Sequence, residues 1–201
     1  MKKINTGHDL IHFYEDVLTK EVCQKIKDFI FNQKNLEANE KHKMPWETSD
    51  TIDLYRYPKD SEIIKLITEN IKTITKLACE SFNIEMYPHF TDLVLWKTGR
   101  KMGIHIDNGD MHPEGSELSK MFEPRHYSAV VYINDDYEGG HTLVMNEDRT
   151  KVIYESKPKT GAVLFFTSDS RCPHGVSQIT GNRVTLPTWF TTNINFKDRL
   201  D

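Results

Sequence analysis

The chain has 201 residues, enough for one sizeable hydrophobic core, and we expect a single domain over residues 1–201. Hydrophobic residues make up 37% and charged residues 28%, a balance that excludes an intrinsically disordered chain. The formal net charge of −4 excludes a global positive field that would draw the protein to nucleic acid or an anionic membrane. No apolar run approaches the roughly 20 residues that a membrane span needs.

The first predicted element is a helix near residues 19–33. Apolar residues recur there at helical spacing, and either Asp16 or Thr19 is suited to cap its start. Residues 34–50 carry many Lys, Glu and Asn residues, which is typical of an exposed loop. A second apolar stripe begins after Ser61, a suitable N-cap residue, and predicts a helix that ends near residue 82. We therefore expect residues 1–83 to be a helical support region.

After Asn83 the sequence changes to short β-rich segments that are separated by turn residues. The predicted strands are residues 91–96, 128–134, 142–145, 162–166 and 183–192. Many short strands of this kind favour an antiparallel sandwich or barrel. The fold class is therefore mainly β with α, in which residues 84–193 form a β core packed behind two N-terminal helices.

Three side chains are candidates for a metal site. Residues 103–107 alternate in the manner of a strand, which places His105 and Asp107 on one face and Ile104 and Ile106 on the other. Taken alone, a His-x-Asp pair is also compatible with a structural or surface role. His174, however, directly follows the apolar strand at residues 161–166, and it could provide a third ligand beside the first two.

Two imidazoles and one carboxylate form the ligand set of non-haem Fe(II) oxygenases, because they leave three positions of an octahedral iron open. Two of these positions suit a chelating keto acid, and the third suits O₂. A keto acid with a distal carboxylate also needs an anchor, and Arg183 offers a planar guanidinium suited to bidentate binding. The alternative for Arg183 is an ordinary surface ion pair. On a strand, Arg183, Thr185 and Trp189 share one face.

The chain resembles the 2-oxoglutarate and Fe(II)-dependent oxygenases over roughly residues 91–193, and most strongly the catalytic domains of prolyl 3-hydroxylases. The segments that carry the resemblance are His105-Ile106-Asp107-Asn108, Tyr127 to Gly140, Pro173-His174-Gly175-Val176, Arg183 and Trp189-Phe190. The sequence departs from the family pattern at His141, where Glu often follows the paired glycines. Arg183 also stands where many prolyl 4-hydroxylases have Lys. Pro187 interrupts the last strand and suggests an edge or a bulge.

This resemblance implies a double-stranded β-helix (jelly roll) that holds Fe(II) with His105, Asp107 and His174. It further implies that Arg183 and Tyr132 bind the distal carboxylate of 2-oxoglutarate, that O₂ is the second cosubstrate, and that ascorbate is the reductant. Residues 108–126 are either a substrate lid or a plain surface loop. Asn108, Arg125 and Trp189 are the candidate substrate-binding residues, although core packing is the alternative for Trp189 and a solvated or structural role the alternative for Arg125.

The leading functional hypothesis is hydroxylation of prolyl residues in a peptide or protein. Two alternatives stay open, namely hydroxylation of a free amino acid or small metabolite, and a non-catalytic jelly-roll protein that binds or senses a ligand. Nucleic-acid demethylation has no support in the acidic charge balance. The three scattered cysteines and the polar N-terminal segment favour a cytoplasmic location over secretion.

Overall fold

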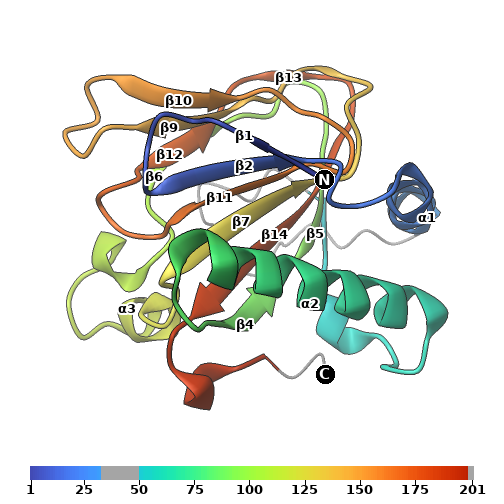
Figure 1. The fold of residues 1–201 in the computed structure, drawn as a ribbon, viewed down its shortest axis with the longest axis horizontal. Coiled ribbons are helices and arrows are strands. Elements are labelled where there is room, and N and C mark those ends of the chain that lie inside the picture. Colours follow the sequence, from blue (N-terminus) through green and yellow to red (C-terminus); the bar gives the residue numbers. More distant parts are fainter. Residues whose placement is uncertain (33–49, 199–201) are drawn as a thin grey trace.

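The computed structural model describes residues 1–32 and 50–198. Its helices are α1 (Lys20–Phe31), α2 (Glu62–Phe82) and α3 (Glu117–Phe122), with the 3-10 turns η1 (Leu54–Arg56), η2 (Gly109–Met111) and η3 (Ile194–Phe196). The predicted loop at residues 34–50 lies outside the described residues, except that Asp50 begins a strand. Figure 1 shows α2 lying across one face of a large sheet, with a smaller sheet above it.

The large sheet has eight strands in the order β1-β2-β11-β7-β14-β5-β3, and β4 also pairs with β14. They are β1 (Lys2–Ile4), β2 (Ile11–Glu15), β3 (Asp50–Ile52), β4 (Tyr87–Thr91), β5 (Leu93–Trp96), β7 (Tyr127–Tyr132), β11 (Val163–Thr167) and β14 (Arg183–Thr191). The small sheet has the order β10-β9-β12-β6, formed by β6 (Met102–His105), β9 (Thr142–Met145), β10 (Val152–Ser156) and β12 (His174–Val176). A further pair joins β8 (Glu138–Gly139) and β13 (Ile179–Thr180).

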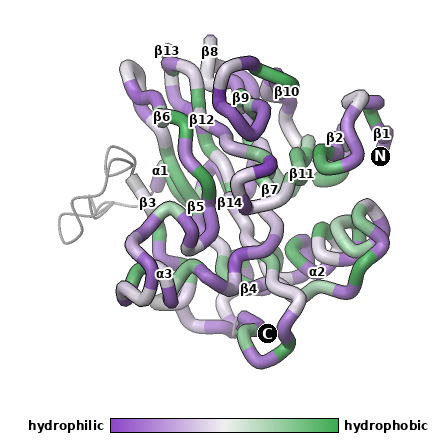
Figure 2. The backbone as a smooth tube through the Cα atoms, turned by 90° about the vertical axis from the view of Figure 1, so that its left-hand side faces the viewer, coloured by the Kyte–Doolittle hydropathy of each residue, from purple (hydrophilic) through white to green (hydrophobic). Residues whose placement is uncertain are grey.

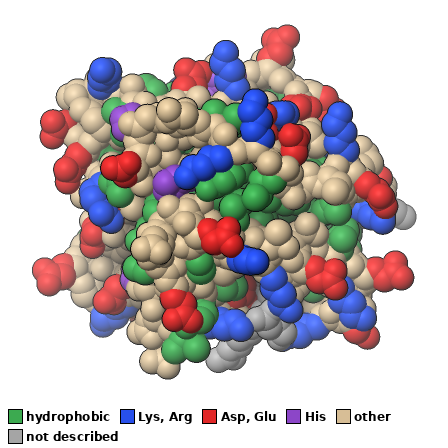
Figure 3. All heavy atoms as spheres, viewed as in Figure 1, with side chains coloured by type: hydrophobic (Ala, Val, Ile, Leu, Met, Phe, Trp, Pro, Cys, Tyr) green, Lys and Arg blue, Asp and Glu red, His purple; other side chains and the backbone are tan. Residues whose placement is uncertain are grey.

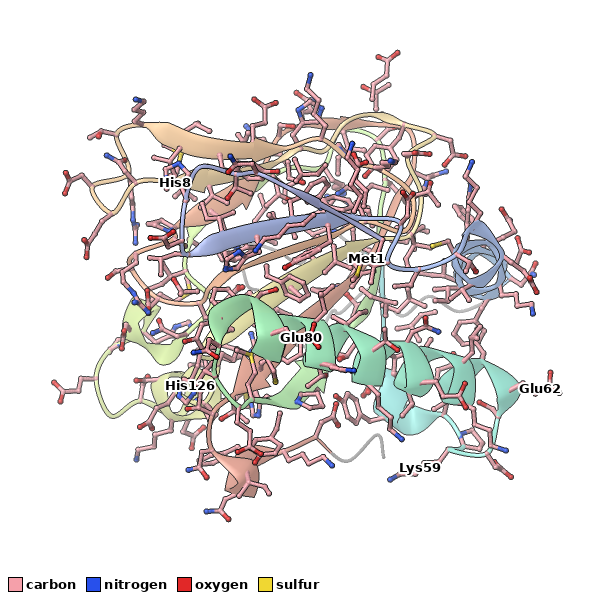
Figure 4. The ribbon with its side chains drawn as sticks, in the orientation of Figure 1. Met1, His8, Lys59, Glu62, Glu80 and His126 are labelled. Carbon is pink, nitrogen blue, oxygen red and sulfur yellow. The ribbon has the colours of Figure 1, made fainter. Side chains whose placement is uncertain are left out.

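Local capping chemistry sets the ends of the two long helices. The side chain of Thr19 accepts a hydrogen bond from the Val22 amide, so Thr19 caps α1, and Asp16 does not. Ser61 caps α2 in the same way, and α2 ends at Asn83, which adopts the left-handed conformation. Both predicted helices are confirmed. In Figure 4, Glu62 marks the first turn of α2.

The expectation that residues 1–83 are helical support is wrong in part, because this region also contributes strands β1, β2 and β3. Strand β2 is an integral part of the large sheet, where it pairs with β11 along Ile11 to Tyr14. Strand β2 is short, and it has buried side chains on both of its faces. Its apolar residues therefore show no clear alternation that would predict a strand.

Alternation along the strands divides the core into two layers. Odd positions of β11, such as Val163 and Phe165, pack against α1 and α2, whereas Leu164 and Phe166 point to the small sheet. The same alternation in β14 directs Val184 toward the helices. In Figure 2, β7 and β14 lie between the small-sheet strands β6 and β12 and helix α2. The space between the two sheets is therefore where a ligand could reach side chains from both.

Pro187 was expected at an edge or a bulge, and the edge is wrong because the residue lies in the interior of the large sheet. It pairs with Val130 of β7 on one side, and on the other side its carbonyl accepts a hydrogen bond from the Asp92 amide. Its nitrogen therefore faces the break where β14 changes partner from β5 to β4. Proline has no amide hydrogen, but at this break no hydrogen bond of the strand ladder is lost.

The surface carries both signs of charge. On the face that Figure 3 shows, acidic and basic side chains are interspersed, in keeping with the modest net charge of −4. None of the helices in the described part of the chain combines the length and the hydrophobicity that crossing a membrane requires.

Replacing a buried apolar side chain of α2 should destabilise the whole domain. Ile74 is fully buried between the helices and the large sheet, so Ile74→Ala should lower the free energy of unfolding by about 2–5 kcal/mol. Lys76→Ala, at an exposed position of the same helix, is the matched control and should change it by less than about 0.5 kcal/mol. Urea unfolding measures both, and equal losses would contradict this account of the core.

Candidate metal centre and its cavity

Two histidines face each other across neighbouring strands of the small sheet. Strands β6 and β12 pair antiparallel with His105 directly opposite His174, and the centres of the two rings are 4.4 Å apart. The Nδ1 atom of His174 lies 3.2 Å from the Cys172 carbonyl, and that of His105 lies 2.9 Å from the Gly103 carbonyl. A ring that donates Nδ1–H to a carbonyl leaves Nε2 free to bind a metal.

The third group, Asp107, reaches the two histidines through a turn. Strand β6 ends at His105, and the amides of Asp107 and Asn108 both donate to the Ser168 carbonyl, at 2.9 and 3.1 Å. The predicted strand over residues 103–107 is therefore wrong at its end. Ile104 and Ile106 accordingly do not share an environment, because Ile104 is 36% exposed and Ile106 only 3%.

The three groups nevertheless converge on one point. The Asp107 carboxylate lies 3.5 Å from Nε2 of His105 and 3.4 Å from Nε2 of His174, and all three potential ligand atoms lie within 4.8 Å of one another. Among residues 1–32 and 50–198, no other group of three such side chains meets this condition. This donor set fits a ferrous ion.

The protonation states of His174 and Asp107 favour metal binding. Burial lowers the pKa of His174 to about 4, so its imidazole is neutral at pH 7. Burial alone would raise the pKa of Asp107, but the neighbouring His174 and His105 and the Ser128 hydroxyl hold it well below its usual range. For His105, the hydrogen bond and charge of Asp107 outweigh burial and raise the pKa. A metal cation would take the place of the proton that these groups share.

Two serines support Asp107, one in strand β7 and one directly after strand β11, and the sequence did not reveal either. The Ser128 hydroxyl donates to Asp107 Oδ2 at 2.6 Å and lies 2.7 Å from the Ser168 hydroxyl. Ser128 is the second residue of β7 and lines the cavity between the sheets, so the two sheets meet at this carboxylate. A single serine in a strand carries no motif, and nothing in the sequence could have singled it out.

The metal centre opens into a cavity between the sheets with a volume of about 180 Å³. Arg183 lines this cavity and is only 2% exposed. It donates a long hydrogen bond to the Thr142 hydroxyl at 3.5 Å, and its Nε atom has no partner among the described residues. A buried guanidinium with so few hydrogen bonds is stabilised when a ligand provides an anionic acceptor. The distal carboxylate of 2-oxoglutarate fits this requirement.

Tyr132 lies beside Arg183 but does not line the cavity. Its hydroxyl pairs with the Thr142 hydroxyl at 2.7 Å, and its ring centre is 5.6 Å from the guanidinium carbon of Arg183. Thr142 therefore connects the two residues that were predicted to bind 2-oxoglutarate, and it was missed because a threonine in a strand is unremarkable. Direct binding of the cosubstrate by Tyr132 stays a prediction.

The structure brings two of the three candidate substrate-binding residues to the cavity. Trp189 lines it, and the guanidinium carbon of Arg125 lies 3.9 Å from the centre of the Trp189 ring and 4.2 Å from that of Phe122. Arg125 is thus neither solvated nor paired with a carboxylate among the described residues. Asn108, in contrast, does not line the cavity, because its side chain caps η2 and bonds to Asp110.

The connection at residues 108–126 folds into η2 and α3, and three of its side chains, Met111, Phe122 and Arg125, line the cavity. It is therefore a wall of the cavity and more than a plain surface loop. His126, which Figure 4 shows beside α3, does not line the cavity, and its Nδ1 accepts a hydrogen bond from the Thr192 amide. His112 likewise stands apart from the metal group.

Comparison with known proteins gives the same fold. The model of the 2OG-Fe(II) oxygenase superfamily matches residues 83–191. Prolyl 3-hydroxylase 2 from Homo sapiens is 39% identical over 101 residues, which are 47% of this chain and 14% of the relative. Prolyl 3-hydroxylase 1 from Mus musculus is 33% identical over 102 residues, 48% of this chain and 14% of the relative. The chain thus spans only a small part of these curated relatives.

Solved structures share the jelly-roll architecture at low sequence identity. A prolyl hydroxylase from Trichoplax adhaerens, in complex with a peptide fragment of hypoxia inducible factor, has a TM-score of 0.69 at 15% identity, covering 92% of this chain and 85% of that one. A prolyl-4-hydroxylase from Pseudomonas putida has a TM-score of 0.64 at 17% identity, with coverage of 90% and 92%. The predicted jelly-roll core with helices packed on it is confirmed.

Removing the carboxylate of the metal centre should abolish metal binding. Asp107→Ala should weaken the affinity for Fe(II) by more than about 100-fold, since loss of a mere outer-shell partner already costs 10- to 100-fold. His112→Ala, a histidine outside the centre, is the control and should bind as the wild type does. Anaerobic titration with metal analysis measures both, and retention of wild-type affinity by Asp107→Ala would exclude this site.

Proposed function

The chain belongs to the 2OG-Fe(II) oxygenase superfamily, and on that premise we propose that it hydroxylates a prolyl residue in a peptide or protein and converts 2-oxoglutarate to succinate and CO₂. One observation carries the proposal. The His105, Asp107 and His174 centre opens into the same cavity as the buried, poorly satisfied Arg183. A metal site and a carboxylate anchor in one enclosed space are what this reaction requires.

Three polar residues of the cavity have a defined part in the proposed reaction. A ferrous ion with 2-oxoglutarate and O₂ supplies the oxidant that hydroxylates an unactivated C–H bond. His105 and His174 would hold the metal through Nε2, because their Nδ1 atoms are bonded to backbone carbonyls. Arg183 binds the distal carboxylate, next to Thr142, and so fixes which way the keto acid points.

Apolar walls between these polar groups exclude water. Val94, Trp96 and Val176, contributed by both sheets, are at most 8% exposed and line the cavity. Such walls strengthen the electrostatic interaction between Arg183 and a bound carboxylate, and they limit side reactions of the oxidant with solvent. The retained ligand set and anchor argue against a non-catalytic jelly-roll protein.

The substrate enters on the side of Trp189 and Arg125. The aromatic face of Trp189 suits an apolar pyrrolidine ring, and Arg125 offers donors for a carbonyl beside it. The names of the relatives support a prolyl substrate, and the Trichoplax adhaerens structure is itself a complex with a peptide. A free amino acid is the alternative that the experiments below distinguish.

Ascorbate as the reductant and a cytoplasmic location complete the proposal. The three cysteines Cys23, Cys79 and Cys172 are all free, which supports a reducing compartment. The proposed role of ascorbate as reductant rests on the resemblance to prolyl hydroxylases alone. Stimulation of turnover by added ascorbate tests it.

The proposed reaction predicts two signals from the wild-type protein. Anaerobic addition of Fe(II) and 2-oxoglutarate should produce a visible charge-transfer absorbance, because the keto acid chelates the iron. In air, a panel of proline-containing peptides should include one that gains a single oxygen atom with equal release of succinate, as mass spectrometry and succinate assay measure. A folded protein without the absorbance would contradict the iron chemistry, and turnover of free proline alone would contradict the peptide substrate.

Neutralising the anchor should affect 2-oxoglutarate specifically. Arg183→Gln should weaken 2-oxoglutarate binding roughly 10- to 100-fold, because a charge-assisted hydrogen bond contributes about 1.5–3 kcal/mol. The charge-transfer titration measures this affinity, and metal analysis confirms that Fe(II) is retained. Arg171→Gln, at an exposed arginine paired with Asp169, is the control and should leave the affinity unchanged. Equal affinities in both variants would rule out the assigned role of Arg183.

A further inference from the structure

Apart from the histidines, four charged side chains line the cavity, namely Asp92, Asp107, Arg125 and Arg183. The proposed function uses Asp107 for the metal and Arg183 for 2-oxoglutarate. It also lets Arg125 donate to a substrate carbonyl, and it leaves one carboxylate in the same space, that of Asp92, without a role. Asp92 was not singled out by the sequence analysis.

Asp92 lies toward the substrate end of the cavity. It occupies the break between β4 and β5, where its amide donates to the Pro187 carbonyl at 3.1 Å. Pro187 is four residues from Arg183 on the same strand, a separation of roughly 13 Å at 3.3 Å per residue. Asp92 is therefore remote from the 2-oxoglutarate anchor, and it lies at the end where Trp189 and Arg125 are found.

Within the described part of the chain, both charged groups lack hydrogen-bond partners. The Arg125 guanidinium stacks on Trp189 and Phe122, but its Nε atom has no hydrogen-bond partner among residues 1–32 and 50–198, and the Asp92 carboxylate forms no hydrogen bond or ion pair with any of these residues. Burial raises the pKa of Asp92 to about 7 against the opposing charge of Arg125, and burial lowers the pKa of Arg125 to about 10. Two buried groups in this condition gain free energy when a ligand provides their hydrogen bonds.

Asp92 is held on a rigid support. The preceding amide, that of Thr91, donates to the Tyr55 hydroxyl at 3.0 Å, and this hydroxyl donates to Asp198 at 2.6 Å. The Tyr55 ring stacks on Phe90, with ring centres 4.9 Å apart and planes 9° apart. A group that is fixed before binding loses little conformational entropy when it meets its ligand.

We propose that Asp92 is a specificity-determining residue that accepts a hydrogen bond from a main-chain N–H of the substrate, while Arg125 donates to a nearby carbonyl. This inference rests on the proposed function. A prolyl nitrogen within a peptide carries no hydrogen, so the N–H belongs to a residue next to the target proline. Together the two side chains form hydrogen bonds with the peptide main chain, whereas Trp189 contacts the ring of the target proline. A free amino acid would offer its ammonium and carboxylate to the same pair.

The test compares Asp92→Ala and Asp92→Asn with Asp148→Asn, a control at an exposed aspartate outside the cavity. Steady-state kinetics use an end-blocked proline peptide that the wild type hydroxylates. Asp92→Ala should raise the KM for this peptide about 10- to 100-fold, the value expected for a hydrogen bond to a charged group. Asp92→Asn, which keeps an acceptor oxygen, should raise it less. The KM for 2-oxoglutarate and the charge-transfer absorbance should stay at wild-type values in all three variants.

A second arm identifies the N–H group. Peptides methylated at the amide before or after the proline are compared, and one of them should be a poor substrate for the wild type but should lose no more activity with Asp92→Ala. If Asp92→Ala leaves the peptide KM unchanged, or weakens 2-oxoglutarate equally, the role of Asp92 is refuted while prolyl hydroxylation stands. If the wild type hydroxylates free proline and no blocked peptide, both proposals are refuted.

Discussion

The direct pairing of His105 with His174 across β6 and β12 is the constraint on which the active site depends. Register in a sheet is an all-or-none property, because a slip of one residue turns a side chain to the opposite face. Once the register is correct, each imidazole is oriented by a carbonyl of its own chain segment. Asp107 then completes the centre from a turn that the Ser168 carbonyl holds in place. Iron chemistry in this protein therefore requires a correctly paired small sheet.

The large sheet contributes the remainder of the site through alternation. Successive residues of β14 point in turn to the helices and to the cavity, so one strand provides core residues such as Val184 and, on its other face, Arg183 and Trp189. Arg183 and Trp189 are six residues apart, so the roles we propose for them would separate cosubstrate from substrate along a single rigid element. A jelly roll thus allows the two ends of the cavity to vary independently, because mutations near Trp189 need not disturb Arg183.

Local sequence signals made the helices and the metal ligands predictable. Residues whose role depends on long-range contacts could not be predicted. Thr19 and Ser61 act on amides three residues away, so their caps can be read from the sequence. His105, Asp107 and His174 belong to a recognisable motif. Ser128, Thr142 and Asp92 gain their importance only from partners far away in the chain, and no pattern marks them. Strand β2 was missed for the same reason, since its partner β11 is about 150 residues distant.

The hydroxyl of Tyr55 links Asp198 to the amide of Thr91, the residue that precedes the cavity-lining Asp92. This contact supports the residue to which we assign substrate recognition, and it does not involve the three metal ligands. Under that assignment, disturbing the contact between Tyr55 and Asp198 would weaken substrate binding while Fe(II) binding is retained.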